Sequence, residues 1–115
     1  MKYMMLIYSN ESGMQTMSEA DRSEMTAAYA AYTQAMMQAG AFVDGGRLRP
    51  SGTATTVRTA NGKTEVLNGP YAETREQLGG FYMLEAADLD AALSWAARCP
   101  AASRGVVEVR PVWET

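Results

Sequence analysis

The pattern of apolar and polar positions changes its period several times along the chain, and each change marks an expected element. A nearly continuous apolar run predicts a strand over residues 2–8, because strands favour β-branched and large apolar side chains. The polar residues 9–17 predict a loop. Apolar positions then recur at helical spacing, which predicts a helix that begins after Ser18 and ends near Ala39. Ser18 and Asp21 form a capping-box-like pair at its start.

The second half of the chain contains shorter elements separated by glycine and proline. We expect a strand at 42–48, a hairpin at 53–67, one helical turn at 72–78, a strand at 80–85, a helix at 89–98 and a strand at 106–113. The hairpin signal is Asn61-Gly62, because a two-residue type I′ turn needs positive φ at both positions. Such a turn places Arg58 opposite Glu65 and Val57 opposite Val66, which are favourable cross-strand pairs.

Two details of these elements are also predicted. Gly45 and Gly46 in the second strand indicate a bulge or a close approach of another group. The last helix should begin after Asp88 and stop before Pro100. Its expected buried face consists of Leu89, Ala92, Leu93 and Ala96.

The expected order is strand, helix, strand, hairpin, strand, helix, strand. This order predicts an α+β fold, a ferredoxin-like sandwich with an inserted β-hairpin, in one domain over residues 1–115. Two helices cover only one face of an antiparallel sheet, so the other face should be polar if it meets water.

The strands are instead apolar on both faces. Alternation in the first strand separates Tyr3, Met5 and Ile7 from Met4, Leu6 and Tyr8. Alternation in the later strand separates Phe81 and Met83 from Tyr82 and Leu84. No spare segment remains to cover the second face, so we expect a second copy of the chain to cover it, as a homodimer of the dimeric α/β barrel type.

The composition and charge of the chain argue against several classes of function. The net charge of -3 and a pI of about 4.9 argue against a nucleic-acid surface, which needs a basic stripe. The longest apolar run, residues 3–8, is too short to span a bilayer, and no small-residue cleavage site follows it. We therefore expect no membrane segment and no signal peptide. Cys99 is the only cysteine, which fits a cytoplasmic location.

Histidine is absent from the chain. This removes the commonest general base and metal ligand, and neither a Ser-His-Asp nor a Cys-His triad can form. A zinc site would need the one cysteine plus carboxylates. The chain also lacks a glycine-rich dinucleotide motif and a P-loop. We therefore expect no metal and no cofactor, and we assign no catalytic residue.

The candidate ligand-binding residues are Tyr29, Asp44, Arg47, Glu73, Arg75 and Tyr82. Tyr29, with Tyr32, either places a phenol where it can orient a ligand or packs in the core. Asp44 and Arg47 flank the double glycine, and they either clamp a polar ligand or pair with each other on the surface.

The sequence allows alternative interpretations of several other residues. On the expected helical turn, Glu73 and Glu76 share a face and can hold a proton between them, or they are simply solvated. Glu85 is either a buried base or a strand-end residue in water. Cys99 lies at a helix C-terminus, where the dipole disfavours a thiolate, so we interpret it as structural. The nine methionines indicate an adaptable apolar cavity or plain core filling.

One run combines a turn, a polar segment, two glycines and an aromatic strand: residues 68–82, NGPYAETREQLGGFY. It resembles the signature of the YCII-related, or DGPF-domain, proteins, with Asn68-Gly69-Pro70-Tyr71 at the place of Asp-Gly-Pro-Phe. The resemblance covers nearly the whole chain, including residues 1–4, 53–58, 87–93 and 107–112. It implies a dimeric α/β barrel. Some members are encoded beside, or fused to, extracytoplasmic-function sigma factors, which implies a sigma factor as a candidate partner.

The YCII branch of the family looks to carry a His–Asp dyad. Alignment on the spacing from Gly40 to Gly46 puts Tyr29 at the place of the histidine and Cys99 near that of the aspartate. Neither required residue is present, so the resemblance does not carry the dyad's chemistry to this chain.

Three functions follow from these observations. The first is a dimeric barrel that binds a small molecule in an apolar pocket. The second is a cofactor-independent enzyme, by analogy of fold, whose base is Asp44, Glu73, Glu85 or Tyr29. The third is an accessory partner of a sigma factor, which the family's gene context alone suggests.

Overall fold

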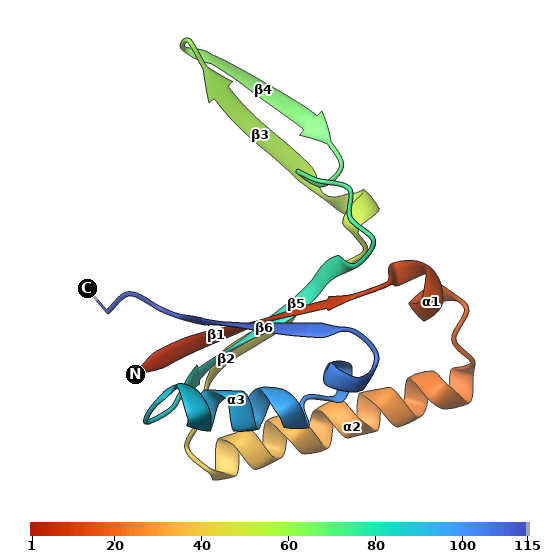
Figure 1. Ribbon diagram of the computed structural model, residues 1–115. Coiled ribbons are helices and arrows are strands. Elements are labelled where there is room, and N and C mark those ends of the chain that lie inside the picture. The colour runs from red at the N-terminus through yellow and green to blue at the C-terminus, as the bar shows by residue number, and fades with distance from the viewer. Residues whose placement is uncertain (115) are drawn as a thin grey trace.

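The structure of the protein is a computed structural model that describes residues 1–114 (Figure 1). One antiparallel sheet has the strand order β2-β5-β1-β6, and β3 and β4 form a separate two-stranded sheet. The elements are β1 (Lys2–Ser9), α1 (Glu11–Gln15), α2 (Glu19–Gln38), β2 (Phe42–Arg47), η1 (Ser51–Thr53), β3 (Thr55–Ala60), β4 (Lys63–Asn68), β5 (Gln77–Glu85), α3 (Leu89–Arg98), η2 (Pro100–Ser103) and β6 (Val106–Pro111). The predicted ferredoxin-like α+β fold is confirmed.

Local sequence signals account for the bounds of α2. The Ser18 side chain accepts a hydrogen bond from the Asp21 backbone N–H at 3.1 Å, as the capping pattern predicts. The helix ends at Gln38, and Gly40 has a φ of +71°, which is the left-handed conformation that glycine adopts without strain. None of the helices within residues 1–114 is both long and apolar enough to cross a membrane.

Helices α2 and α3 lie on the same face of the four-stranded sheet (Figure 1). The core lies between these two layers, and Met5, Met36 and Leu84 are its largest fully buried side chains. Tyr3 and Ile7 join Met5 on this side of β1, so one of the two predicted apolar sets faces the helices. The opposite face of the sheet, which we call the open face, carries no helix of residues 1–114 (Figure 1).

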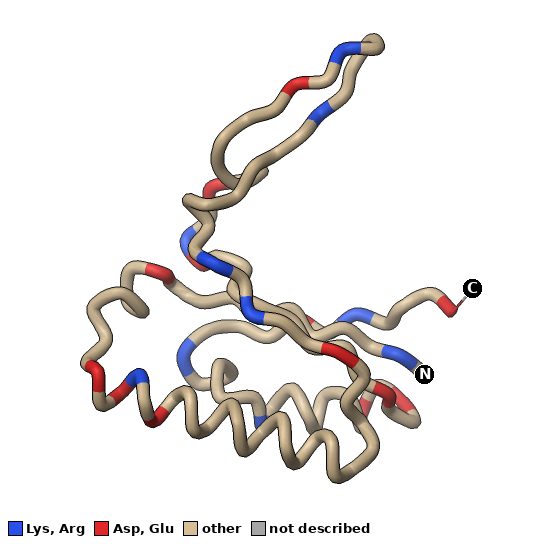
Figure 2. The backbone as a smooth tube through the Cα atoms, turned by 180° about the vertical axis from the view of Figure 1, so that it is seen from behind, with Lys and Arg blue, Asp and Glu red and all other residues tan. Residues whose placement is uncertain are grey.

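The β3–β4 hairpin, which we call the arm, projects from the body on the side of the open face (Figure 1). Its register confirms the prediction: Arg58 lies opposite Glu65 and Val57 opposite Val66. Asn61-Gly62 makes the turn, with φ values of +53° and +75°. The arm gives the chain a radius of gyration of 16.1 Å, against about 13 Å for a compact domain of this length. Charged residues of both signs are spread over body and arm (Figure 2).

Two predictions of local secondary structure are wrong. Residues 9–17 contain the short helix α1, which Asn10 caps by accepting from the Gly13 N–H. Residues 72–78 form no helical turn; the chain bends there and β5 begins at Gln77, because pairing with Tyr8 and Ser9 extends the strand. Tertiary pairing thus overrides a weak local propensity.

The buried face of α3 also differs from the predicted one. Ala92 and Ala96 are buried as expected, but Leu89 is 47% and Leu93 45% exposed. The small alanine side chains let α3 lie close to the body, and Trp95 packs beside them. In β2 the bulge lies between Phe42 and Asp44 rather than at the two glycines.

Candidate functional site

The open face of the sheet has an apolar centre. Strand pairing places Met4 opposite Met83 and Leu6 opposite Phe81, so these four side chains share one face of the two central strands. All four are half-buried, whereas their neighbours on the other face are buried under the helices. The centre consists of two methionines, a leucine and a phenylalanine, which are flexible or large apolar groups.

Polar groups border this apolar centre at both edge strands. On β2, Asp44 lies opposite Met83, and its side chain accepts a hydrogen bond from the Gly45 N–H at 2.8 Å. On β6, Glu108 lies opposite Leu6, and its Oε2 accepts from Arg110 Nε at 2.7 Å. The face therefore has an apolar centre and a polar rim, which is the anatomy of a protein–protein interface.

The two glycines of β2 approach β5 on opposite faces. A Cβ at Gly45 would lie 3.0 Å from the Tyr82 ring, on the helix side. A Cβ at Gly46 would lie 3.2 Å from the Phe81 ring, on the open face. The predicted close approach at this pair is confirmed, and the absence of a side chain at Gly46 leaves the Phe81 ring uncrowded from this edge.

Tyr82 belongs to the core rather than to the open face. Its hydroxyl is hydrogen-bonded to the Thr33 hydroxyl at 2.7 Å, and its ring packs edge-on against Tyr32 with centroids 5.4 Å apart. Tyr32 in turn donates to the Trp95 carbonyl oxygen at 2.7 Å. Burial raises the pKa of both tyrosines. Both hydroxyls thus have internal partners, as buried polar groups need.

Tyr29 and Cys99 lie side by side beneath the sheet. Burial raises the pKa of each group, and each side chain also acts on the pKa of the other. The Arg47 side chain is near enough to lower the pKa of Tyr29, but this effect is smaller than that of burial. Phenol and thiol are therefore both protonated at neutral pH, so the pair can donate a hydrogen bond but cannot act as a general base.

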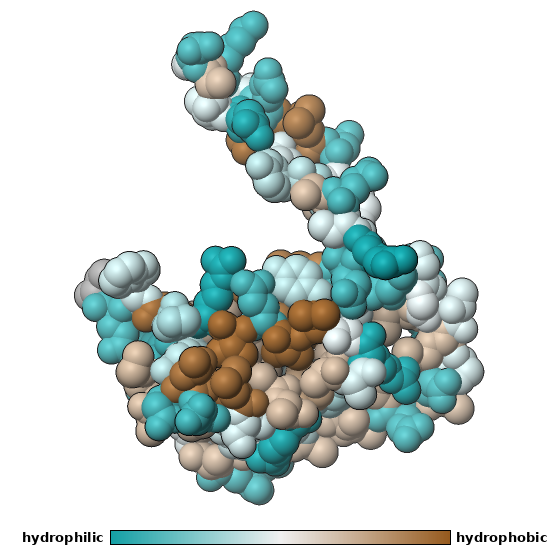
Figure 3. All heavy atoms as spheres, in the orientation of Figure 1, coloured by the Kyte–Doolittle hydropathy of each residue, from teal (hydrophilic) through white to brown (hydrophobic). Residues whose placement is uncertain are grey.

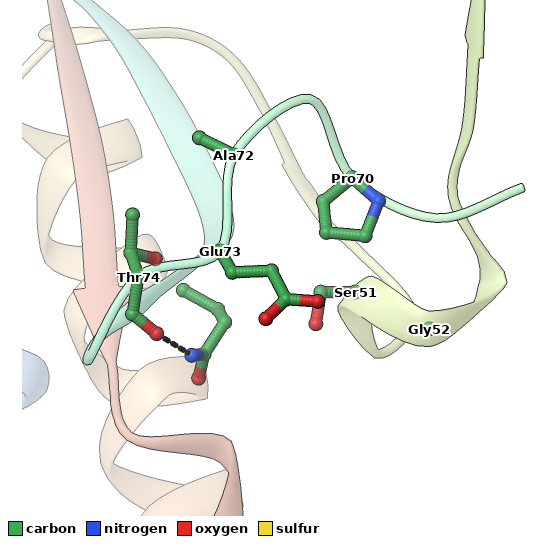
Figure 4. A pocket seen from close by; sticks show the side chains of 7 residues that line it. Ser51, Gly52, Pro70, Ala72, Glu73 and Thr74 are labelled. Atoms are coloured by element: carbon green, nitrogen blue, oxygen red, sulfur yellow. Dashed lines mark hydrogen bonds between the residues drawn. The ribbon is translucent and has the colours of Figure 1, made fainter. Parts of the chain in front are cut away.

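A small hollow lies at the root of the arm, and Glu73 projects into it toward Ser51 (Figure 4). Its volume is about 260 Å³, below the range of about 300–1,000 Å³ that is usual for ligand pockets. Two of its lining side chains already have partners: Ser51 N–H and Oγ donate to the Glu11 carboxylate at 2.6 and 2.7 Å, and Gln77 donates to the Thr74 carbonyl. The lining residues are Ser51, Gly52, Pro70, Ala72, Glu73, Thr74 and Gln77.

The remaining candidate groups are exposed and separate. Asp44 and Arg47 alternate to opposite faces of β2, and no ion pair joins them among the described residues. Arg75 is exposed in the bend before β5, and the helical face proposed for Glu73 and Glu76 does not exist. Glu85 is exposed and pairs with the N-terminal ammonium at 3.2 Å, which is the strand-end role. Residues 1–114 also hold no cluster of three His, Cys, Asp or Glu side chains suited to a metal.

Comparison with known proteins gives the chain its family. The model of the YCII-related domain matches residues 1–115. The chain belongs to the YCII-related family. An uncharacterized protein of Rhizobium meliloti (strain 1021) is 38% identical to this YCII-related protein over 114 residues, which cover 97% of this chain and 92% of the relative.

In this YCII-related protein, the two positions that the resemblance assigns to a His–Asp dyad are brought together by the fold. Tyr29 lies on α2, and Cys99 follows α3 directly. The alignment by spacing thus selects two neighbouring residues, although both carry groups that stay protonated.

The sequence analysis missed the polar rim on β6. Glu108 and Arg110 alternate with Val107 and Val109, which is the period-2 signal of a strand with one polar face. That signal was present in the sequence, but only the pairing of β6 with β1 shows that the polar side chains lie on the open face.

Proposed function

We propose that this YCII-related protein is a homodimer whose two sheets face each other and hold a small, largely apolar molecule between them. The observation that carries the proposal is the row of half-buried apolar side chains on the open face. Met4, Leu6, Phe81 and Met83 form this row on adjacent strands, with no helix over them. Figure 1 shows that the described part of the chain supplies no layer on this side of the sheet.

The energetics favour covering this face. Complete burial of one large apolar side chain stabilises by about 1.5–3 kcal/mol. The four side chains of the row are only half-buried, so covering all four would add the remaining part of this stabilisation four times. A second sheet stacks about 10 Å away, which lets the side chains of two inner faces interdigitate. The surrounding polar groups can stay at the rim, where Asp44 and the Glu108–Arg110 pair remain in contact with water.

The side chains of the face also fit an adaptable pocket. Met4 and Met83 have flexible side chains that adjust to irregular shapes. Gly46 presents no side chain beside the Phe81 ring, so β2 leaves room there. Asp44 supplies one carboxylate at the edge, and a carboxylate accepts hydrogen bonds from a hydroxyl or an ammonium group. The ligand class is therefore an apolar molecule with one hydrogen-bond-donating end.

Asp44 and Glu85 are the groups of the enzyme hypothesis on this face, since Tyr29 is beneath the sheet and Glu73 is at the root of the arm. Glu85 lies at the end of β5, where it pairs with the N-terminal ammonium, so Asp44 is the one beside the apolar centre. Its role in the proposal is to orient the ligand. A sigma factor stays a predicted partner that rests on the family's gene context, and membership of the sigma-factor-associated branch stays a prediction with it.

The test of the pocket is a fluorescence titration with Nile red, a neutral apolar dye. We expect saturable binding to the dimer and its loss in Leu6→Trp, because the larger ring fills the space between the sheets. The control is Leu93→Trp, since Leu93 is exposed on α3. Absence of saturable binding by a verified dimer, or equal loss in both variants, would contradict the pocket.

A further inference from the structure

The arm lacks the packing that a two-stranded sheet needs. Thr56 is the one residue of β3 and β4 that is not exposed. The two strands pair only with each other. An isolated two-stranded hairpin is at best marginally stable in water, because it buries too little apolar surface to offset the ordering of its backbone. The arm therefore needs a surface that the described part of its own chain does not provide.

The arm carries apolar side chains on both of its faces. Val57 and Val66 lie opposite each other on one face and are 61% and 63% exposed. Leu67, on the other face, is 54% exposed. Figure 3 shows these apolar groups midway along a mostly polar arm. These side chains lie in the middle of the strands rather than at the root, so a second molecule can reach them.

The root of the arm is held firmly, so its direction is set before any partner binds. The Glu11 carboxylate accepts from both Ser51 N–H and Ser51 Oγ at the start of η1. The strand ends are joined by the hydrogen bond from Gly69 N–H to the Ala54 carbonyl at 2.7 Å. Thr56 Oγ adds a bond to the Gly69 carbonyl at 2.8 Å. A pre-organised arm loses less conformational entropy on association than a flexible one.

Geometry relates the arm to the open face. The arm leaves the body between β2 and β5 and rises on the side of the open face, opposite the helices (Figure 1). Strands of six residues extend about 20 Å at about 3.3 Å per residue. A second sheet on the open face lies only about 10 Å away. An arm of this length reaches past the sheet of a second copy and along its side.

We infer that the arm of each subunit packs against the body of a second copy and buries Val57 and Val66 there. The inference rests on the proposed homodimer and adds a second region of contact to it, outside the sheet faces. By two-fold symmetry each subunit gives one arm and receives one, so the two contacts form together. The occupant of the arm's apolar faces is thus another copy of this chain.

The test is the double substitution Val57→Lys/Val66→Lys, measured by sedimentation velocity over a range of protein concentrations. Both side chains are exposed within the subunit, so the body should fold normally, with unchanged far-ultraviolet circular dichroism. We expect the dissociation constant of the dimer to rise at least about tenfold, because two buried valines are replaced by charges. Ala27→Lys, on an exposed position of α2, is the charge control and should leave the constant unchanged.

A second measurement identifies the contact directly. A photoreactive benzoyl-phenylalanine in place of Val57 should yield a covalent product of twice the chain mass, with the cross-link mapping to the body of the second copy. If the dimer cross-links only within its own chain and tolerates the lysine substitutions, this inference is wrong while the homodimer stands. The arm would then bind a different protein. A monomeric unmodified protein overturns both.

Discussion

The two faces of β1 have nearly the same composition but different surroundings. Tyr3, Met5 and Ile7 are buried by α2, α3 and the neighbouring strands. Met4, Leu6 and Tyr8 alternate with them and stay half-buried on the open face. A strand that is apolar on both faces, yet covered on one, is incomplete as a single subunit. The proposed homodimer accounts for this difference, because a second copy would supply the missing layer.

The largest expected difference between the two faces is in the unfolding free energy lost on truncating Met5, on the helix side, and Met4, on the open face. Met5→Ala should lower the free energy of unfolding by about 2–5 kcal/mol, because Met5 is fully buried and a cavity remains. Met4→Ala should lower it by less than about 1.5 kcal/mol in the dissociated subunit and should instead weaken the dimer. Urea unfolding at low protein concentration measures the first effect, and sedimentation the second. Equal unfolding losses would contradict the contrast.

The two adjacent glycines of β2 allow a more direct comparison of the two faces, because a Cβ at Gly45 lies on the helix side and a Cβ at Gly46 on the open face. Gly45→Ala places a Cβ 3.0 Å from the Tyr82 ring and 3.2 Å from the Phe81 carbonyl oxygen. Because Tyr82 is held by Thr33, we expect a loss of about 1–3 kcal/mol in unfolding free energy. Gly46→Ala meets only the Phe81 ring, which can turn on the open face, so the loss should be below about 1 kcal/mol. Thermal unfolding of both variants checks the order, and the reverse order would refute it.

High pH should affect the helix side of the sheet specifically. Burial raises the pKa of Tyr29, Tyr32 and Tyr82 above 10.0 and that of Cys99 above 9.0. In the unfolded chain these groups lose their protons first, so the unfolded state binds fewer protons above those values. Stability should be intact below about pH 9 and fall as pH rises further, by up to about 1.4 kcal/mol per pH unit for a fully buried group.

Urea midpoints between pH 7 and 11 measure this decline. The conservative variant Cys99→Ser should remove the part that begins near pH 9, because the thiol is the one of these four groups whose ordinary pKa is 9.0. Midpoints that stay constant up to pH 11 would show that these groups are not buried in the folded protein.

A substitution in the arm should have the smallest effect on the stability of the body. Gly62→Ala places a side chain at a φ of +75°, which costs about 1 kcal/mol in left-handed conformation. The arm packs on nothing in its own body, so the strain should speed amide exchange in β3 and β4 and leave the exchange of β1 and β5 unchanged. A slowed or unchanged exchange in the arm would contradict the account of its turn.

Strong local signals in the sequence predicted much of this fold. Asn61-Gly62 set the hairpin and its register, since few turns tolerate positive φ at two successive residues. Ser18 and Asp88 marked the starts of α2 and α3, and both side chains accept hydrogen bonds from the first turn. Alternation in β1 separated its two faces correctly, but alternation alone does not say which face the helices take.

The errors arose where tertiary contacts decide. Residues 72–78 have a polar, helix-compatible composition, yet pairing of Gln77 and Leu78 with β1 draws them into β5. Leu89 and Leu93 follow a helical spacing, but α3 packs through its alanines instead. Among the candidate site residues, Tyr82 is in the core and Glu73 at the root of the arm, because strand parity and loop geometry, not residue type, set their positions.

The mass of the protein in solution tests the central claim most directly. Multi-angle light scattering of the unmodified protein at micromolar concentration should give twice the 12.5 kDa chain mass. Met4→Lys, on the open face, should split that dimer, whereas Gln34→Lys on the exposed side of α2 should not. A monomer of 12.5 kDa for the unmodified protein, or a dimer that persists in Met4→Lys, would contradict the claim that a second copy covers the open face.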